Sequence, residues 1–128
     1  MNPLLLTLVI GFAGTLGTLV RFALDGYFAS NHPHHRHWPW ATFWVNAVGS
    51  LLIGLAFGWA HSGHLSSGWQ LVISTGLAGG LTTFSSWTTA TVRLISEKRV
   101  VGAVLNVGAN LLVGITAAGV GILLGELL

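Results

Sequence analysis

The sequence has no cysteine and very few charged side chains. Its 128 residues include five Lys or Arg and three Asp or Glu, so that 6% of the chain is charged while 52% is hydrophobic. Soluble domains carry about 25% charged and about 45–50% apolar residues. This composition excludes a soluble domain and indicates a protein that lies in a lipid bilayer. The lack of cysteine also excludes disulfide bonds and thiolate metal sites.

The scarcity of charge leaves three long uncharged stretches. Residues 1–20, 38–92 and 100–125 contain no Asp, Glu, Lys or Arg. A helix needs about 20 apolar residues to cross a hydrocarbon core of ~30 Å. We therefore predict an all-α integral membrane protein, a single domain over residues 1–128 with four membrane spans. The spans are expected near residues 4–24, 41–60, 69–92 and 100–124.

Two further absences narrow the function. The chain begins without Lys or Arg, unlike a secretory signal, so we expect the first span to be retained. Asp25, Glu97 and Glu126 all lie at span ends or in loops, which argues against a proton-coupled antiporter working on an intramembrane acid. The basic residues are too few for a nucleic-acid-binding surface, and we interpret them as anchors at the membrane surface.

The loop before the second span is rich in histidine. Because imidazole is a common metal ligand, this loop is a candidate metal-binding tract. We favour a solvated loop, because a run interrupted by proline defines no site geometry. The residues concerned are His32, His34, His35 and His37, together with Arg36.

Glycine is abundant, with 18 residues. Small residues let membrane helices approach closely, and packing then drives their association. Gly54 and Gly58, and likewise Gly121 and Gly125, have the four-residue spacing of such contacts. A further set at three-residue spacing in the first span is Gly11, Gly14 and Gly17. These patterns predict tightly packed helices, and they do not indicate what the protein transports.

Polar side chains follow one face of three predicted spans. A polar group in hydrocarbon needs a partner, so these side chains are expected to face the bundle interior or a wet cavity. The alternative is hydrogen bonding between helices, worth about 0.6 kcal/mol per bond. The stripes are Thr7, Thr15, Thr18 and Arg21 in the first span, Thr42, Asn46 and Ser50 in the second, and Asn106 and Asn110 in the fourth.

The third predicted span contains a glycine pair followed by hydroxyl residues, GLAGGLTTFSSWTT over residues 76–89. Gly79 and Gly80 can adopt backbone angles closed to other residues. In transporters, helix breaks at mid-membrane expose backbone groups that hold ions. We therefore predict a third helix broken at mid-membrane. The alternative is an unbroken packing helix rich in Ser and Thr.

The polar groups of the spans are mainly hydrogen-bond donors. Asn amides, Ser and Thr hydroxyls, and the electropositive edges of Phe84 and Trp87 suit a small anion that accepts strong hydrogen bonds. For the two aromatic rings, simple packing is the alternative.

Three motifs resemble the Fluc/CrcB family of fluoride channels, and the resemblance extends over essentially the whole chain. They are Gly11, Gly14 and Gly17 with Arg21, the segment WPWATFWVNAVGS over residues 38–50, and GGLTTFS over residues 79–85. The family consists of dimers of two oppositely oriented four-helix subunits with two narrow pores. The resemblance implies an antiparallel dimer, and a passive fluoride-selective channel in the cell membrane rather than an enzyme.

The resemblance also implies roles for single residues. A structural sodium ion on the dimer axis would be bound by the backbone carbonyls of Gly79 and Thr82. The arginine of the first span would attract anions, or alternatively reach lipid headgroups. The implied pore-lining or anion-contacting residues are Asn46, Thr83, Phe84, Ser85, Trp87, Asn106, Asn110 and Arg21.

The chain departs from the family at three positions. Trp87 replaces a second phenylalanine, Gly114 a small hydroxyl residue, and Ala90 a frequent glutamate. These changes leave the implied sodium site intact but weaken the lining of one pore. The alternatives to a channel are a small multidrug-type transporter subunit, whose expected acid in the first span is absent, and a non-conducting accessory subunit of a heterodimer.

The basic residues are unequally distributed between the two sides of the membrane. With four crossings, the loops after the first and third spans share a side. That side receives Arg21, Arg36, Arg93, Lys98 and Arg99, and the other side has no Lys or Arg. Basic residues near span ends favour the cytoplasm, so both termini are expected outside. One preferred orientation favours a homologous partner chain of opposite orientation, with a homodimer as the alternative.

Overall fold

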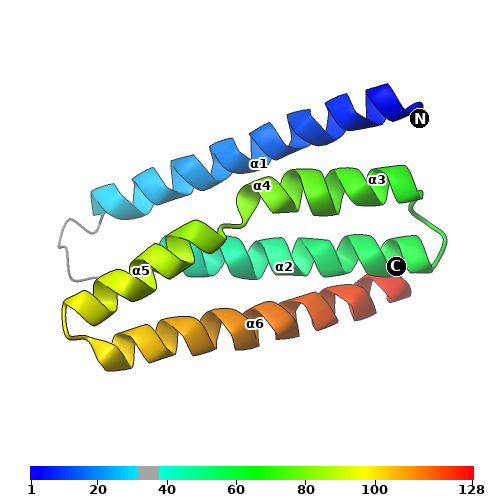
Figure 1. Ribbon diagram of the computed structural model, residues 1–128. Coiled ribbons are helices and arrows are strands. Elements are labelled where there is room, and N and C mark those ends of the chain that lie inside the picture. Colours follow the sequence, from blue (N-terminus) through cyan, green and yellow to red (C-terminus); the bar gives the residue numbers. More distant parts are fainter. Residues whose placement is uncertain (32–37) are drawn as a thin grey trace.

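The structure is a computed structural model that describes residues 1–31 and 38–128 (Figure 1). All regular secondary structure in these two ranges is helical. The elements are α1 (Pro3–Asn31), α2 (Trp40–His61), α3 (Ser67–Leu71), the π-helical η1 (Val72–Ala78), α4 (Gly79–Leu81), α5 (Phe84–Ser96) and α6 (Val100–Leu127).

Three helices, α1, α2 and α6, are each long and apolar enough to cross a membrane. Between α2 and α6, the helices α3, η1 and α4 follow one another directly and are separated from α5 by two residues. We call residues 67–96 the broken segment. A full span needs about 20 residues, and each half of the broken segment is shorter than that. The first half runs beside α2, and α5 continues toward the other end of the bundle, where it packs mainly on α6 (Figure 1).

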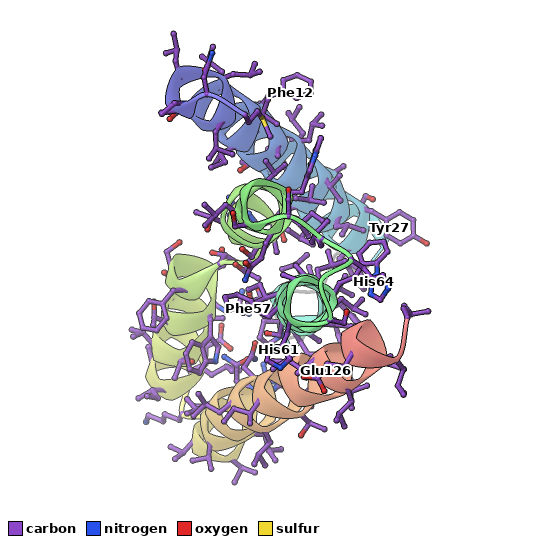
Figure 2. The ribbon with its side chains drawn as sticks, turned by 90° about the vertical axis from the view of Figure 1, so that its right-hand side faces the viewer. Phe12, Tyr27, Phe57, His61, His64 and Glu126 are labelled. Carbon is purple, nitrogen blue, oxygen red and sulfur yellow. The ribbon has the colours of Figure 1, made fainter. Side chains whose placement is uncertain are left out.

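The central helix of the bundle is α2. It packs along α6 and contacts η1, while α1 packs on η1 and α4, and α5 packs on α6. Figure 2 shows α1 and α6 on opposite sides of α2 and the first half of the broken segment. In the most apolar window of each helix, 33% of α2 is buried within the chain, against 11% of α1 and of α6. The outer helices therefore present most of their surface outward.

Alanine and a few larger aliphatic residues fill the interior, and most large apolar residues lie on the outside. Phe12 and Tyr27 on α1 are 67% and 62% exposed and point away from the bundle (Figure 2). The buried hydrophobic residues are Ala13, Val45, Ala56, Val72, Ala78, Leu81, Ala90, Leu94 and Ala103. This distribution suits a protein whose outer surface meets lipid and whose helices associate by close packing.

The paired glycines of α2 and α6 face each other, as their spacing predicts. A Cβ on Gly54 or Gly58 would overlap the backbone of α6, and a Cβ on Gly121 or Gly125 would overlap the backbone of α2. The two helices therefore touch along their main chains. This contact keeps α2 and α6 in a defined register. The register places Asn46 of α2 next to Asn110 of α6, and the two side chains are hydrogen-bonded.

The predicted break in the third span is present, but the glycine pair does not cause it. Gly79 has φ −62° and ψ −39°, which are ordinary helical angles. The extended residues are Thr82 and Thr83, with ψ of 157° and 119°. Gly80 provides space instead, because a Cβ there would overlap the carbonyl oxygen of Gly14 in α1. The prediction was thus wrong about the residues that break the helix.

Short turns reverse the chain at the ends of the bundle. Both termini and the turn after α2 lie at one end, and the turn between α5 and α6 lies at the other (Figure 1). In that turn the amides of Lys98 and Arg99 donate to the carbonyls of Ile95 and Leu94 at 2.9 and 2.8 Å. This is a Schellman motif, in which Lys98, with φ 59°, takes the left-handed position that glycine usually occupies.

We expect Gly17→Ala to destabilise the bundle and Gly26→Ala, on the same helix, to leave it intact. A Cβ on Gly17 would overlap the Leu77 carbonyl oxygen and lie 2.8 Å from the Leu81 amide nitrogen, whereas nothing lies within 4 Å of a Cβ on Gly26. Overpacking of this kind costs about 1–3 kcal/mol. Titration with a denaturing detergent measures the free energy of unfolding. Equal stability of the two variants would contradict the close contact between α1 and the broken segment.

Candidate functional site

Asn46 of α2 holds the helix break through both ends of its side-chain amide. The Thr83 amide donates to Asn46 Oδ1 at 2.8 Å, and Asn46 Nδ2 donates to the Thr83 carbonyl at 3.2 Å. In a continued helix the Thr83 amide would donate to the Gly79 carbonyl, so Asn46 replaces that bond. The Thr83 hydroxyl also accepts from the Ser86 amide at 3.1 Å and caps α5. Side chains thus satisfy backbone groups that the break releases.

A series of hydrogen bonds leads from Asn46 to the interface between α5 and α6. Asn46 Nδ2 donates to Asn110 Oδ1 at 3.1 Å, and Asn110 Nδ2 donates to the backbone and side-chain oxygens of Asn106 at 2.9 and 3.1 Å. Asn106 Nδ2 donates to the Thr91 hydroxyl at 2.9 Å and to the Trp87 carbonyl at 3.4 Å. We call Asn46, Asn110 and Asn106 the asparagine chain.

The backbone of Thr83 determines how every amide of the asparagine chain is oriented. A backbone N–H only donates and a carbonyl only accepts, so Asn46 must turn its oxygen to the first and its nitrogen to the second. Asn110 must then turn its oxygen to Asn46 and its nitrogen to Asn106. Each of the three amide nitrogens uses both N–H groups within the protein. The asparagine chain is therefore a scaffold whose N–H groups are already committed.

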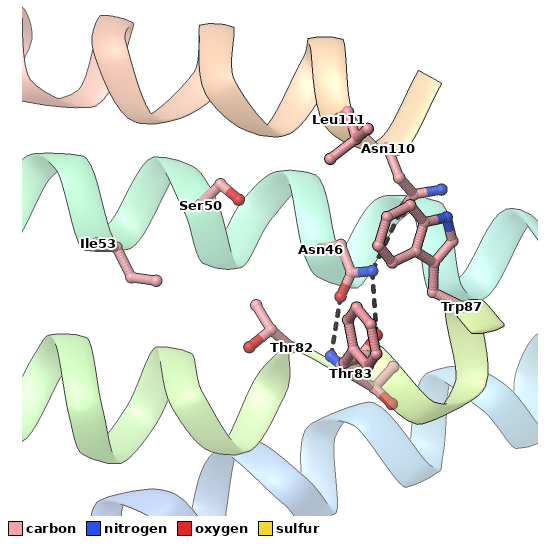
Figure 3. A pocket seen from close by; sticks show the side chains of 9 residues that line it. Asn46, Ser50, Ile53, Thr82, Thr83, Trp87, Asn110 and Leu111 are labelled. Carbon is pink, nitrogen blue, oxygen red and sulfur yellow. Dashed lines mark hydrogen bonds between the residues drawn. The ribbon is translucent and has the colours of Figure 1, made fainter. Parts of the chain in front are cut away.

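A pocket of about 280 Å³ opens beside the break. Figure 3 shows the bonds between Asn46 and Thr83 at its wall, with Ser50 and Ile53 further along α2. None of the residues that line the pocket is charged. They are Asn46, Ser50, Ile53, Thr82, Thr83, Phe84, Trp87, Asn110 and Leu111. The pocket thus combines hydroxyls, amides and aromatic rings in an otherwise apolar wall.

Two aromatic rings form one side of the pocket. Phe84 and Trp87 lie with their centroids 5.5 Å apart at 78°, an edge-to-face arrangement. Phe84 is 72% exposed in the single chain. The indole N–H of Trp87 donates to the Asn106 backbone carbonyl at 3.1 Å. In Figure 3 the indole nitrogen lies on the side of the ring away from Ser50. The N–H donor of Trp87 is therefore used inside the protein.

Arg21 reaches the other side of the break from α1. Its Nε donates to the Gly80 carbonyl at 3.3 Å, and the Thr18 hydroxyl lies at 3.3 Å from the same oxygen. In a continued helix this carbonyl would accept from the Phe84 amide, so α1 supplies partners for a group near the break. Arg21 does not line the pocket. Its observed contact is with the backbone of the broken segment.

The pocket brings together some of the predicted pore residues and leaves others outside. Ser85 lies beside the lining, with its Oγ 3.3 Å from Thr83 Oγ1. Asn106 is fully buried and lies behind Asn110. The predicted residues that line the pocket are Asn46, Thr83, Phe84, Trp87 and Asn110.

Several contributors to the site were not predicted. Ser50 had a signal, because it continues the polar stripe of Asn46, but it was not among the predicted pore residues. Ile53 and Leu111 carry no signal in the sequence beyond being apolar. Thr91 belongs to a hydroxyl-rich run, but only the structure places its hydroxyl against Asn106.

The predicted cation ligands lie on the α4 side of the break. The Gly79 carbonyl has lost the Thr83 amide to Asn46, and the Thr82 hydroxyl approaches it at 3.5 Å. Gly79 is exposed. In the described part of the chain, no group of three or more His, Cys, Asp or Glu is placed to hold a metal ion. A cation here would therefore depend on backbone oxygens. The histidine-rich tract, residues 32–37, lies outside the described residues.

The long apolar helices and the outward-facing apolar side chains define a multi-pass membrane protein. The chain matches the family described as CrcB-like protein, Camphor Resistance (CrcB), over residues 8–122, and it belongs to that family. A relative from Renibacterium salmoninarum is 45% identical over 92% of this chain and 97% of its own length. Relatives from Thermococcus gammatolerans and Escherichia coli are 36% and 38% identical, over 94% and 88% of this chain and 96% and 85% of their own lengths. All three relatives are described as fluoride-specific ion channels.

We expect Asn46→Leu to destabilise the protein strongly, because leucine has a similar size but leaves the N–H and carbonyl of Thr83 without their side-chain partner. An unsatisfied buried polar group costs about 1–3 kcal/mol. Ser50→Ala, one helical turn further along the same pocket wall, is the matched control and should cost less. The free energy of unfolding in detergent micelles measures both. If the two variants lost equal stability, Asn46 would not be holding the break.

Proposed function

We propose that this protein is a passive, fluoride-selective ion channel of the cell membrane. Relatives that match most of the chain are fluoride-specific ion channels. The structural observation that supports the proposal is the uncharged pocket at the helix break, with its hydroxyls and aromatic rings. Such groups suit a small anion that accepts strong hydrogen bonds. The protein's task is transport and not catalysis.

The proposed direction of transport follows from the acid chemistry of fluoride. In acidic surroundings hydrogen fluoride crosses lipid as a neutral acid, ionises in the cytoplasm and is trapped there as the anion. A passive channel lets the accumulated anion leave, and no coupling ion is needed. A pocket lined by no acidic side chain fits this uncoupled mechanism.

The groups that contact the ion are proposed from what the protein leaves uncommitted. Because the amide N–H groups of the asparagine chain already have partners, we assign the direct contacts to Ser50 and to the exposed edge of Phe84. Asn46 then acts mainly by holding Thr83 in place. A weak set of contacts of this kind favours passage over retention.

Fluoride efflux from liposomes containing the purified protein tests the function. We expect fluoride to leave much faster than chloride, and chloride leaving as fast as fluoride would contradict the proposed selectivity. Phe84→Ile should slow fluoride efflux because it removes the aromatic edge. Phe12→Ile, an exposed ring on α1 that points away from the bundle, is the control and should have no effect (Figure 2). Asn46→Asp should reduce efflux more than about tenfold, because a charge at mid-membrane costs about 2.5 kcal/mol or more.

We further propose that the chain crosses the membrane four times and pairs with a subunit of opposite orientation. Both termini lie at one end of the bundle, as an even number of crossings requires (Figure 1). Phe84 lines the pocket and is nevertheless 72% exposed in the single chain. A second subunit placed against this face would close the pocket into a pore and remove the ring from lipid.

The distribution of basic residues favours a homologous chain as that partner. Lys98 and Arg99 lie in the turn between α5 and α6, at the end opposite both termini (Figure 1). Arg21 lies within α1 and contacts the broken segment, so it contributes less to orientation. Omitting Arg21 and Arg93 still leaves three basic residues on one side and none on the other. Such a bias selects one orientation, with both termini outside.

Terminal reporters of cytoplasmic and external exposure test the orientation. We expect an external signal from both ends of the chain, because the basic loops are retained in the cytoplasm. Moving the two basic residues Lys98 and Arg99 from the α5–α6 turn to the turn after α2 should shift the signal toward the cytoplasm. Comparable signals from both sides, with fluoride efflux by this chain alone, would instead establish a homodimer.

We also propose a structural sodium ion held by the carbonyls of Gly79 and Thr82. A hard cation is bound by several oxygens, so two carbonyls need the same pair from a second subunit. The Gly79 carbonyl suits this role because Gly79 is exposed and the Thr83 amide, the helical partner of this carbonyl, bonds to Asn46 instead.

Replacing sodium by an organic cation tests this ion. The parent dimer should lose thermal stability without sodium, and Thr82→Ala should keep that dependence, since only backbone oxygens are ligands. Gly79→Val should abolish the dependence on sodium, because the new side chain would crowd the face toward the partner. The substitution should leave the fold of the single chain intact, since a Cβ at Gly79 makes only an ordinary van der Waals contact within it. A parent dimer of equal stability in both cations would exclude the sodium ion.

A further inference from the structure

The interface between α5 and α6 contains a reciprocal pair of hydrogen bonds behind the pocket wall. Trp87 donates its indole N–H to the backbone carbonyl of Asn106 at 3.1 Å. Asn106 donates its side-chain amide back to the Trp87 carbonyl at 3.4 Å and to the Thr91 hydroxyl at 2.9 Å. The Thr91 hydroxyl also donates to the Trp87 carbonyl at 2.9 Å. Trp87 is thus bonded to α6 twice, once through its indole nitrogen and once through its backbone carbonyl, which accepts from Asn106.

Asn106 is among the most completely buried residues of the chain, with 0% of its surface exposed. A buried amide is unfavourable unless its groups are hydrogen-bonded, and a leucine of similar volume would pack without that requirement. The side chain of Asn106 meets the requirement on every side, because its oxygen accepts from Asn110 and its nitrogen has two acceptors. We therefore look for the contribution of Asn106 in how its bonds orient the Trp87 backbone and the Thr91 hydroxyl.

We propose that the side chain of Asn106 is a positioning group for Trp87. Its bonds to the Trp87 carbonyl and the Thr91 hydroxyl hold α5 where the indole N–H meets the Asn106 backbone carbonyl instead of the ion pathway. The inference rests on the proposed function of the pocket. Trp87 lines the pocket, and its free N–H would be the strongest hydrogen-bond donor of the aromatic wall. With the N–H bound to α6, the ring offers the pocket only weakly polar C–H groups. Asn106 thereby keeps an anion from being held at Trp87.

Thr91 completes the arrangement from α5. It does not line the pocket, but it accepts from Asn106 and bonds to the backbone of Trp87. Removing its hydroxyl should loosen the indole without changing any group that faces an ion. Thr91→Val therefore provides a milder second variant, in case the substitution of Asn106 prevents folding.

A double-mutant cycle on fluoride efflux tests the proposal. Asn106→Leu removes two donor bonds, and each average bond between helices shifts an equilibrium by about threefold, so efflux per active channel should slow by about tenfold. The substitution also removes the side-chain acceptor of Asn110, an effect that both backgrounds share. In the Trp87→Phe background, where there is no indole N–H to release, the same substitution should therefore slow efflux much less than in the parent. Thr91→Val should slow efflux by about threefold in the parent and little in that background.

Two features of the measurement separate positioning from folding. At low protein-to-lipid ratio, the fraction of vesicles that empty reports the number of active channels, and the rate of emptying reports the single channel. A merely structural Asn106 would lower the fraction and leave the rate unchanged. Thr116→Val, at an exposed hydroxyl of α6 bonded within its own helix, is the control and should change neither.

The indole proton gives a readout that does not depend on transport. The Trp87 N–H signal, identified by its loss in Trp87→Phe, should exchange slowly with solvent deuterium and should not shift when sodium fluoride is added. Asn106→Leu or Thr91→Val should accelerate its exchange. A parent signal that exchanges rapidly or shifts with fluoride would overturn the proposal, as would an equal slowing of efflux in both backgrounds. If the parent fails to conduct fluoride, the proposed function fails and the exchange measurement alone decides the inference.

Discussion

The fold depends on how a broken helix satisfies its backbone inside a membrane. Lipid offers no hydrogen bonds, so each backbone group released by a break must find a partner in the protein, at a cost of several kcal/mol if it does not. At Thr83 a donor and an acceptor lie together, and a neutral side chain that provides both is an amide. Asn46 meets both requirements at 2.8 and 3.2 Å. On the α4 side of the break the released group is the Gly80 carbonyl, and its partners come from α1, from the Thr18 hydroxyl and the Nε of Arg21.

These polar contacts form only where the helices approach one another very closely. The geometry of the site therefore depends on the helix packing. Gly80 lies against Gly14 with no room for a Cβ, and this brings Thr18 and Arg21 of α1 within reach of the break. On the other side, glycines in both α2 and α6 bring the two main chains together. That contact fixes the register in which asparagines from the two helices meet. A bulkier residue at such a contact would therefore disturb the polar network as well as the packing.

Some parts of this arrangement could be predicted from the sequence and others could not. Uncharged stretches predicted where the long helices lie, and four-residue spacing correctly paired the glycines of α2 and α6. Polar stripes indicated Asn46 and Asn110, because periodicity places residues on one face. The cause of the break was mispredicted, since glycine serves both for unusual backbone angles and for close contact, and a single sequence does not distinguish the two. The partner of each polar group was equally hidden. Only the fold brings Thr91 to Asn106, or Arg21 to a carbonyl.

The same network bears on how an uncharged pocket could pass an anion. A fixed positive charge in the lining would bind fluoride strongly and hold it, whereas conduction needs binding that is favourable but weak. The guanidinium of Arg21 is directed by its Nε to the backbone of the broken segment and does not line the pocket. The amide N–H groups of the asparagine chain and the indole N–H of Trp87 are committed to protein acceptors in the same way. These bonds leave the strongest donors beside the pocket committed to acceptors within the protein. If the pocket is the pathway, as proposed, the groups left to meet the ion are hydroxyls and ring edges, and their weak binding favours passage over retention.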